Sequence, residues 1–225
     1  MKEKDLDIYF IAESWLNETD TIPIGEIENR GQFRLINKPR PNRSGGGVCC
    51  IFKPHFKVVK EETINRITME ILEVTLEICG SKLSVVTIYR PGSSKKNAYH
   101  MDVFFAELTE LLAHYSNYKN EVIFVGDFNI HVNYHNNTNT KRLLTILEMF
   151  DLKQHVNEPT HKNGNTLDLV ITKQQSVVKL CEVDELNSDH TNILMTANIE
   201  KPVHAKKKIK TKKIEISFLI LLEKT

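Results

Sequence analysis

Short apolar segments separated by polar turns recur along the first 200 residues of this chain. Leu6 to Ala12, Leu83 to Arg90 and Val122 to Val125 are apolar runs of strand length, which are typical of buried β-strands. The same reasoning predicts strands after the Gly-rich turn at 43–47 and within 67–78, 166–172, 177–183 and 193–199. Within 67–78 the alternation changes phase between Ile71 and Leu72, which predicts a β-bulge there.

Two segments instead carry apolar residues at helical spacing. In 99–116 the apolar positions recur every three or four residues, and the shorter segment 140–151 repeats the pattern. In a chain of 225 residues, these elements predict one α/β domain with a substantial core, built as two layers of β-structure flanked by helices.

Polar side chains directly follow one of the strands. Asp127 and Asn129 come after Gly126, which we expect to end the strand that begins at Val122. Being two positions apart, they project to the same side if the chain stays extended. A carboxylate beside a carboxamide can hold a water, a phosphate oxygen or a hard cation, but the same residues also favour an Asx turn. Both interpretations remain open on this segment alone.

Similar polar groups stand at other strand ends or within strands. They are Glu13, the pair Tyr89 and Arg90, Asp168, and the pair Asp189 and His190. No Ser or Cys stands beside a partnering base, and no cofactor fingerprint is present. Carboxylates, an amide, a phenol and a histidine suit metal-assisted hydrolysis of a phosphate ester, with Mg²⁺ or Mn²⁺ as the cofactor.

Charge is unevenly distributed, although the net charge is only +1. Residues 206–225 contain seven Lys and two Glu, whereas the other 205 residues contain 23 basic and 27 acidic side chains. An acidic body argues against a general polyanion-binding surface, so nucleic acid would have to meet a local patch or the basic end. We expect residues 1–200 to form the domain and 201–225 to be a Lys-rich linker or tail.

Four cysteines without paired spacing (Cys49, Cys50, Cys79 and Cys181) are typical of a reducing compartment. The polar start contains no signal-type segment, and the longest apolar stretch, 214–222, is far shorter than the ~20 residues of a membrane span. We therefore expect an intracellular protein, nuclear or cytoplasmic and not secreted, with no membrane partner.

Taken in order, the motifs resemble those of one known family. The chain contains Glu13-Ser-Trp-Leu, Gly45-Gly-Gly-Val-Cys, Tyr89-Arg-Pro, Gly126-Asp-Phe-Asn, Thr166-Leu-Asp-Leu-Val and Ser188-Asp-His. This set is similar to the endonuclease/exonuclease/phosphatase superfamily, and the segment 151–168 resembles the apurinic-type endonuclease domain of LINE-type (non-LTR) retrotransposons. The resemblance covers about residues 5–200. It implies a DNase I-like fold, a four-layer α-β-β-α sandwich whose site lies where the two sheets open at one end.

The resemblance also implies a role for each strand-end residue. Glu13 would bind Mg²⁺. Asp127 would orient and activate the attacking water, while Asn129 and Tyr89 contact the phosphate. His190 would act on the scissile phosphate as a base or as a charge stabiliser.

The two carboxylates around His190 would differ in role. Adjacent residues in an extended chain point apart, so Asp168 is the better partner to orient His190, and Asp189 would sit nearer the metal. The candidates for substrate contacts are Arg90, Thr160, Asn165 and Thr166.

One feature departs from the family pattern. Family members begin with a further strand carrying an Asn that contacts metal or phosphate, but only twelve residues precede Glu13 and none is that Asn. We therefore expect the fold to lack its first strand and to leave an unpaired sheet edge.

The implied activity is Mg²⁺-dependent endonucleolytic nicking of DNA with 3′-hydroxyl and 5′-phosphate products, in a family whose members are fused to a reverse transcriptase absent here. Another superfamily chemistry, such as an inositol phosphate phosphatase, fits the segment 151–168 less well. The alternative from a different class is a catalytically impaired remnant that acts as a nucleic-acid-binding or interaction module.

Overall fold

Two six-stranded sheets face each other in the structure, a computed structural model that describes residues 6–17, 19, 31–41, 45–92, 100–186, 188–200 and 211–220. Strands of the first sheet are β1 Ile8–Ala12, β2 Arg34–Lys38, β3 Val48–Phe52, β10 Val178–Leu186, β11 Thr191–Glu200 and β12 Thr211–Ile220. Strands of the second are β4 Lys57–Asn65, β5 Glu70–Ile78, β6 Ser81–Tyr89, β7 Glu121–Asp127, β8 Leu152–Gln154 and β9 Asp168–Lys173. The strand orders are β10-β11-β12-β1-β3-β2 and β4-β5-β6-β7-β9-β8.

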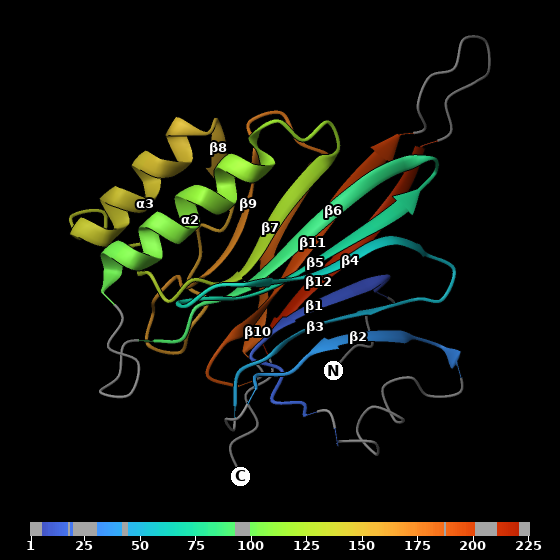
Figure 1. Cartoon of the computed structure of the whole chain (residues 1–225), viewed down its shortest axis with the longest axis horizontal. Helices are drawn as coiled ribbons and strands as arrows, with labels where there is room; N and C mark the ends of the chain where they lie inside the picture. Colours follow the sequence, from blue (N-terminus) through green and yellow to red (C-terminus); the bar gives the residue numbers. More distant parts are fainter. Residues whose placement is uncertain are drawn as a thin grey trace.

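Two helices, α2 Met101–Ser116 and α3 Thr138–Met149, cover the outer face of the second sheet (Figure 1). One apolar core fills the space between the sheets, with Phe10, Phe52 and Val125 buried in it. A second core lies under the helices around Phe104 and Leu147. The predicted α/β fold class is confirmed, and the described residues build three of the four expected layers. No helix in the described part of the chain is long and apolar enough to cross a membrane.

The predicted bulge in 67–78 is wrong. β5 pairs with β6 in continuous register from Glu70 to Ile78. The apolar pattern changes phase because Glu73, which faces the helices, is fully buried there. Its carboxylate accepts hydrogen bonds from the Tyr115 hydroxyl at 2.6 Å and from Lys60 Nζ at 2.7 Å, which makes its burial tolerable.

Gly126 does not end its strand, contrary to the sequence prediction. β7 continues to Asp127, and Gly126 lies inside it with φ of +142°. A Cβ atom at this position would overlap the carbonyl oxygen of Ile88 on the neighbouring strand. The glycine is therefore required by the close approach of two backbones.

The segment after residue 200 corrects two expectations. Residues 211–220, expected to belong to a linker or tail, form β12. This strand lies parallel to β1 on one side and antiparallel to β11 on the other. The expected unpaired edge beside β1 is therefore absent, because β12 pairs with that edge (Figure 1).

Candidate active site

Three of the expected residues form a row across the second sheet. Tyr89 is opposite Asp127 in the β6–β7 register, and Asp127 is opposite Asp168 in the β7–β9 register. Residues directly opposite on neighbouring strands project to the same face, so these three side chains converge at one end of the sandwich. All three are buried, with exposed fractions of 5%, 2% and 0%.

The first sheet contributes the facing groups. His190 immediately precedes β11, and its Nδ1 lies 2.8 Å from Oδ2 of Asp168. Glu13 immediately follows β1, and its carboxylate accepts a hydrogen bond from the Tyr89 hydroxyl. Each of these two hydrogen bonds links one sheet to the other, as the sequence prediction for Asp168 and His190 requires.

Electrostatics in this cluster follow from its burial. Burial raises the pKa of Asp127 well above its ordinary value, and the charge of Asp168 adds to the effect. Burial likewise raises the pKa of Glu13, against the hydrogen bond from Tyr89. Burial by itself would lower the pKa of His190, but the hydrogen bond and charge of Asp168 raise it above the ordinary value. Because Asp168 accepts the Nδ1 proton, the Nε2 atom of His190 remains available.

The backbone around Glu13 is held in a conformation that non-glycine residues seldom adopt. Glu13 and Trp15 have φ of 60° and 58°. Their loop pairs with the Gly-rich turn, since Ser14 N donates to Gly47 O at 3.0 Å and Trp15 N to Gly46 O at 2.8 Å. Strained residues persist where the surroundings determine them strongly, so this pairing fixes the position of the Glu13 carboxylate.

Sequence reasoning missed Arg40 and Glu70, which contact Tyr89 and the Gly-rich turn that pairs with the Glu13 loop. Arg40 forms an ion pair with Glu70 and lies 5.4 Å from the ring centroid of Tyr89. The other oxygen of Glu70 accepts from Gly47 N at 2.6 Å. A Cβ atom at Gly46 would overlap the Arg40 guanidinium, so the glycines make room for this arginine. The Gly-Gly-Gly motif was the available signal, and it was interpreted only as a turn before a strand.

Asn129 lies beside Asp127, but through a turn and not along an extended strand. Its φ is 49°, and its backbone N–H donates to Asp127 Oδ1 at 2.8 Å, as in an Asx turn. The side-chain nitrogen donates to Asp127 Oδ2 and to Arg90 O, both at 2.8 Å. One side-chain N–H group thus holds Asp127 and the other holds the Arg90 carbonyl, which leaves Oδ1 of Asn129 for other contacts.

Arg90 is buried, not directed at the solvent. Its Nε donates to Phe128 O at 2.6 Å and its Nη2 to Asn129 O at 2.7 Å. The guanidinium also lies 5.1 Å from the ring centroid of Phe104. These contacts hold the loop that carries Asn129 and do not support the expected substrate contact.

Replacing Arg90 with methionine should therefore destabilise the protein by about 2 kcal/mol, since buried carbonyls lose their charged donors. Urea unfolding followed by circular dichroism measures this change. Lys57→Met, at an exposed position on β4, is the control and should leave stability within ~0.5 kcal/mol. Unchanged stability of the Arg90 variant together with weaker substrate binding would restore the substrate role.

Two of the other substrate candidates, Thr160 and Thr166, bind backbone groups next to the site. Thr160 is fully buried, and its Oγ1 accepts from the backbone N–H of Leu167 at 3.0 Å and of Asp168 at 3.1 Å. Thr166 is also buried and donates to Glu158 O at 2.9 Å. Asn165 instead has a buried Oδ1 without a hydrogen-bond partner among the described residues.

Two further residues border the cluster. Asp189 forms an ion pair with Lys162, with Oδ1 and Nζ 2.6 Å apart, so its assignment as a metal ligand stays a prediction. His161, which sequence reasoning did not single out, lies with its ring centroid 4.8 Å from that of His190 at a steep angle. Burial, and then the charge of His190, lower the pKa of His161.

A divalent cation fits this donor set. In the described part of the chain, Asp127, Asp168 and His190 offer ligand atoms within 4.8 Å of one another. Oδ1 of Asp168 is buried and has no hydrogen-bond partner there. Buried carboxylates without partners are costly, and a hard cation satisfies such oxygen atoms.

Comparison with known proteins agrees with this geometry. A family model described as endonuclease-reverse transcriptase matches residues 83–194, which include Tyr89, Asp127, Asp168 and His190. The chain belongs to the endonuclease/exonuclease/phosphatase superfamily. No curated protein matches its sequence.

Solved structures of the superfamily share the fold. The 3′ phosphatase NExo from Neisseria, bound to a product DNA hairpin, has a TM-score of 0.64 at 15% identity, covering 83% of this chain and 87% of its own. An AP endonuclease from Archaeoglobus fulgidus has a TM-score of 0.63 at 14% identity, with coverages of 86% and 89%. The endonuclease domain of TRAS1, a telomere-specific non-LTR retrotransposon, has a TM-score of 0.58 at 11% identity, with coverages of 84% and 96%. At these identities the likeness establishes the fold alone.

Proposed function

We propose that this protein is a metal-dependent endonuclease that nicks DNA and leaves 3′-hydroxyl and 5′-phosphate ends. The observation that carries the proposal is the convergence of Asp127, Asp168 and His190, with Glu13 and Tyr89 facing them, at one end of the sandwich. The similarity to an endonuclease-reverse transcriptase family model and to the TRAS1 endonuclease domain favours DNA as the substrate.

In the proposed reaction, Asp127 orients the attacking water and accepts its proton. The raised pKa of this carboxyl, caused first by burial, makes its ionised form a stronger base than an ordinary aspartate. The water oxygen bonds to phosphorus, the bond between phosphorus and the 3′ oxygen breaks, and the leaving 3′ oxygen takes a proton from solvent water. Asn129 keeps Asp127 in position through its two hydrogen bonds to the carboxylate.

Tyr89 and His190 stabilise the phosphate during this displacement. The Nε2 atom of His190 faces the phosphate because Asp168 holds Nδ1 at 2.8 Å. Glu13 is the proposed ligand of Mg²⁺ or Mn²⁺, and the unpartnered Oδ1 of Asp168 is a further donor for the cation. The bound cation would neutralise charge that develops on the phosphate and the leaving oxygen.

Metal removal provides the direct test. Purified protein should convert supercoiled plasmid to the nicked circle in Mg²⁺, and EDTA should abolish the conversion. Asp127→Asn, which keeps the size of the side chain but removes its basicity, should lower the rate by at least ~100-fold.

The outcomes separate the two functional hypotheses. Nicking by wild type that persists in EDTA, or nicking by the Asp127→Asn variant at the wild-type rate, would contradict the proposal. Folded wild-type protein that fails to nick would favour the alternative, a catalytically impaired module that binds nucleic acid.

A further inference from the structure

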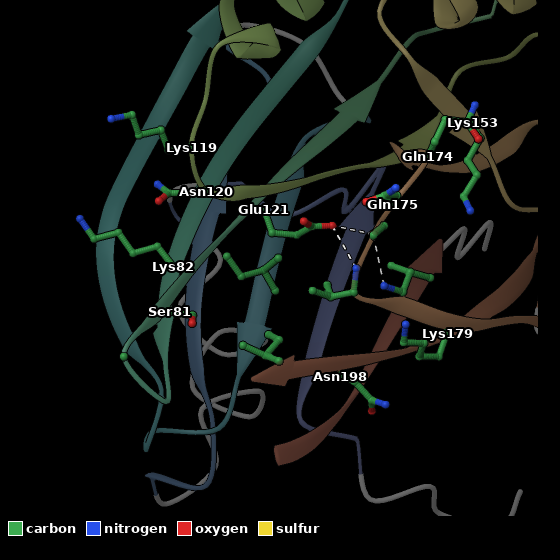
Figure 2. A pocket seen from close by; sticks show the side chains of 16 residues that line it. Ser81, Lys82, Lys119, Asn120, Glu121, Lys153, Gln174, Gln175, Lys179 and Asn198 are labelled. Carbon is green, nitrogen blue, oxygen red and sulfur yellow. Dashed lines mark hydrogen bonds between the residues drawn. The ribbon is translucent and has the colours of Figure 1, made fainter. Parts of the chain in front are cut away.

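An open cleft of about 1020 Å³, whose lining Figure 2 shows, lies at the opposite end of strands β6 and β7 from the candidate active site. It is lined by the first residues of β6 and β7, while the candidate catalytic residues stand at the last residues of these strands. At ~3.3 Å per strand residue, the two places are roughly 20–26 Å apart. The cleft is therefore separate from the nuclease site.

Positive charge gathers around this cleft. Its lining includes Lys82, Lys119, Lys153 and Lys179. Lys82 and Lys119 lie on one side of the opening, and Lys153 and Lys179 lie on the other (Figure 2). The single acidic residue of the lining, Glu121, is already engaged, because its Oε1 accepts from Ser176 Oγ at 2.6 Å and from Val177 N at 3.2 Å.

These four lysines differ from most others in the described ranges. Lys53, Lys57, Lys60 and Lys162 each form an ion pair with a carboxylate. Within the described ranges, none of the four cleft lysines has a carboxylate oxygen within ion-pair distance. Residues 1–205 contain more acidic than basic side chains, so four unpaired cations around one cleft form a local exception.

The chemistry of the lining indicates the ligand. The remaining polar side chains are mainly amides, Asn120, Gln174, Gln175 and Asn198, and no aromatic ring lines the cleft. Ammonium and amide groups donate to phosphate oxygens, whereas base recognition in single strands relies on aromatic stacking. Lysines on both sides of a cleft of this volume suit several consecutive phosphates better than one small anion.

We propose that this cleft binds the phosphodiester backbone of a nucleic acid strand, without sequence preference, at a distance from the nuclease site. Such a contact would hold a second segment of RNA or DNA while the other end of the domain acts on its own substrate. The proposal does not depend on nuclease activity.

Fluorescence anisotropy with labelled 20-nucleotide single-stranded RNA, single-stranded DNA and duplex DNA tests it. The titrations are made in EDTA, so that no cleavage occurs, and at several salt concentrations. The cleft variant combines Lys82→Gln, Lys119→Gln, Lys153→Gln and Lys179→Gln. The control variant removes the same charge from exposed positions elsewhere, with Arg34→Gln, Lys57→Gln, Lys141→Gln and Arg142→Gln.

The cleft variant should bind at least ~10-fold more weakly than the control variant in ~100 mM salt. Its slope of log K against log salt should be smaller by about 3, as expected when four contacts to single-strand phosphates are lost. The nucleic acid whose affinity falls most in the cleft variant identifies whether the cleft binds RNA, single-stranded DNA or duplex DNA. Equal affinity and equal slope for the two variants, or no binding by wild type at ~50 mM salt, would overturn the proposal. Circular dichroism confirms that both variants are folded.

Discussion

Replacing His190 with alanine should lower the rate of plasmid nicking in Mg²⁺ by about 1,000-fold. The imidazole is buried, and its Nδ1 is fixed by Asp168 at 2.8 Å, so alanine removes a positioned group from the site. A well-positioned acid or base contributes ~100- to 10,000-fold to a proton-transfer step, and the loss of charge stabilisation at the phosphate adds to this.

Two further variants serve as a negative control and as a test of how His190 is positioned. His135→Ala removes an exposed histidine from a nearby loop and should nick at the wild-type rate. Asp168→Asn keeps the volume of its side chain but cannot hold the same tautomer of His190, so its rate should fall nearly as far. Thermal unfolding of each variant shows whether the domain is intact. Activity of the His190 variant within threefold of wild type would remove this residue from the mechanism.

Removing residues 201–225 should prevent the domain from folding cooperatively. β12 is paired on both sides, with eight residue pairs to β11 and five to β1. At ~1 kcal/mol for each backbone hydrogen bond, the lost pairing is comparable to the ~5–15 kcal/mol that stabilises a typical domain. The truncated chain would also expose two strand edges, which favour aggregation.

The matched control for this truncation ends at residue 220 and keeps the whole of β12. It should unfold with the same cooperativity and midpoint as the full chain, whereas the chain 1–200 should show no cooperative transition or should elute as aggregates. Size-exclusion chromatography and thermal circular dichroism measure both properties. A monomeric chain 1–200 with an unchanged midpoint would show that β12 is dispensable.

The sequence predicted the strands whose residues are buried on both faces or alternate cleanly. The runs at Leu6–Ala12, Leu83–Arg90 and 166–172 correspond to β1, β6 and β9 within two residues at each end. β4 escaped prediction because it is an edge strand whose residues are largely exposed and charged. β12 escaped because six lysines between 206 and 213 indicate a solvated segment, whereas its pairing is decided by the gap between β1 and β11.

The candidate site shows a similar division. Register places Tyr89, Asp127 and Asp168 in one row, so predicting the strands was nearly sufficient to bring them together. The contacts of Arg90 and Asn129 could not be predicted, because both depend on a left-handed turn after β7 that directs amide and guanidinium donors inward. The ion pair of Arg40 could not be predicted either, because its partner Glu70 is thirty positions away in the chain.

The position of β12 also sets an order of events during synthesis. Ile8 pairs with Ile216, so the strand that precedes Glu13 lacks one of its two neighbours until about 200 further residues have been made. When only the first 200 residues have emerged from the ribosome, β1 and β11 therefore still lack the strand that lies between them. Pairing over such a separation in sequence is slow, because a large loop must close before any contact compensates for the lost entropy. The first sheet is thus completed only after residue 220 has left the ribosome.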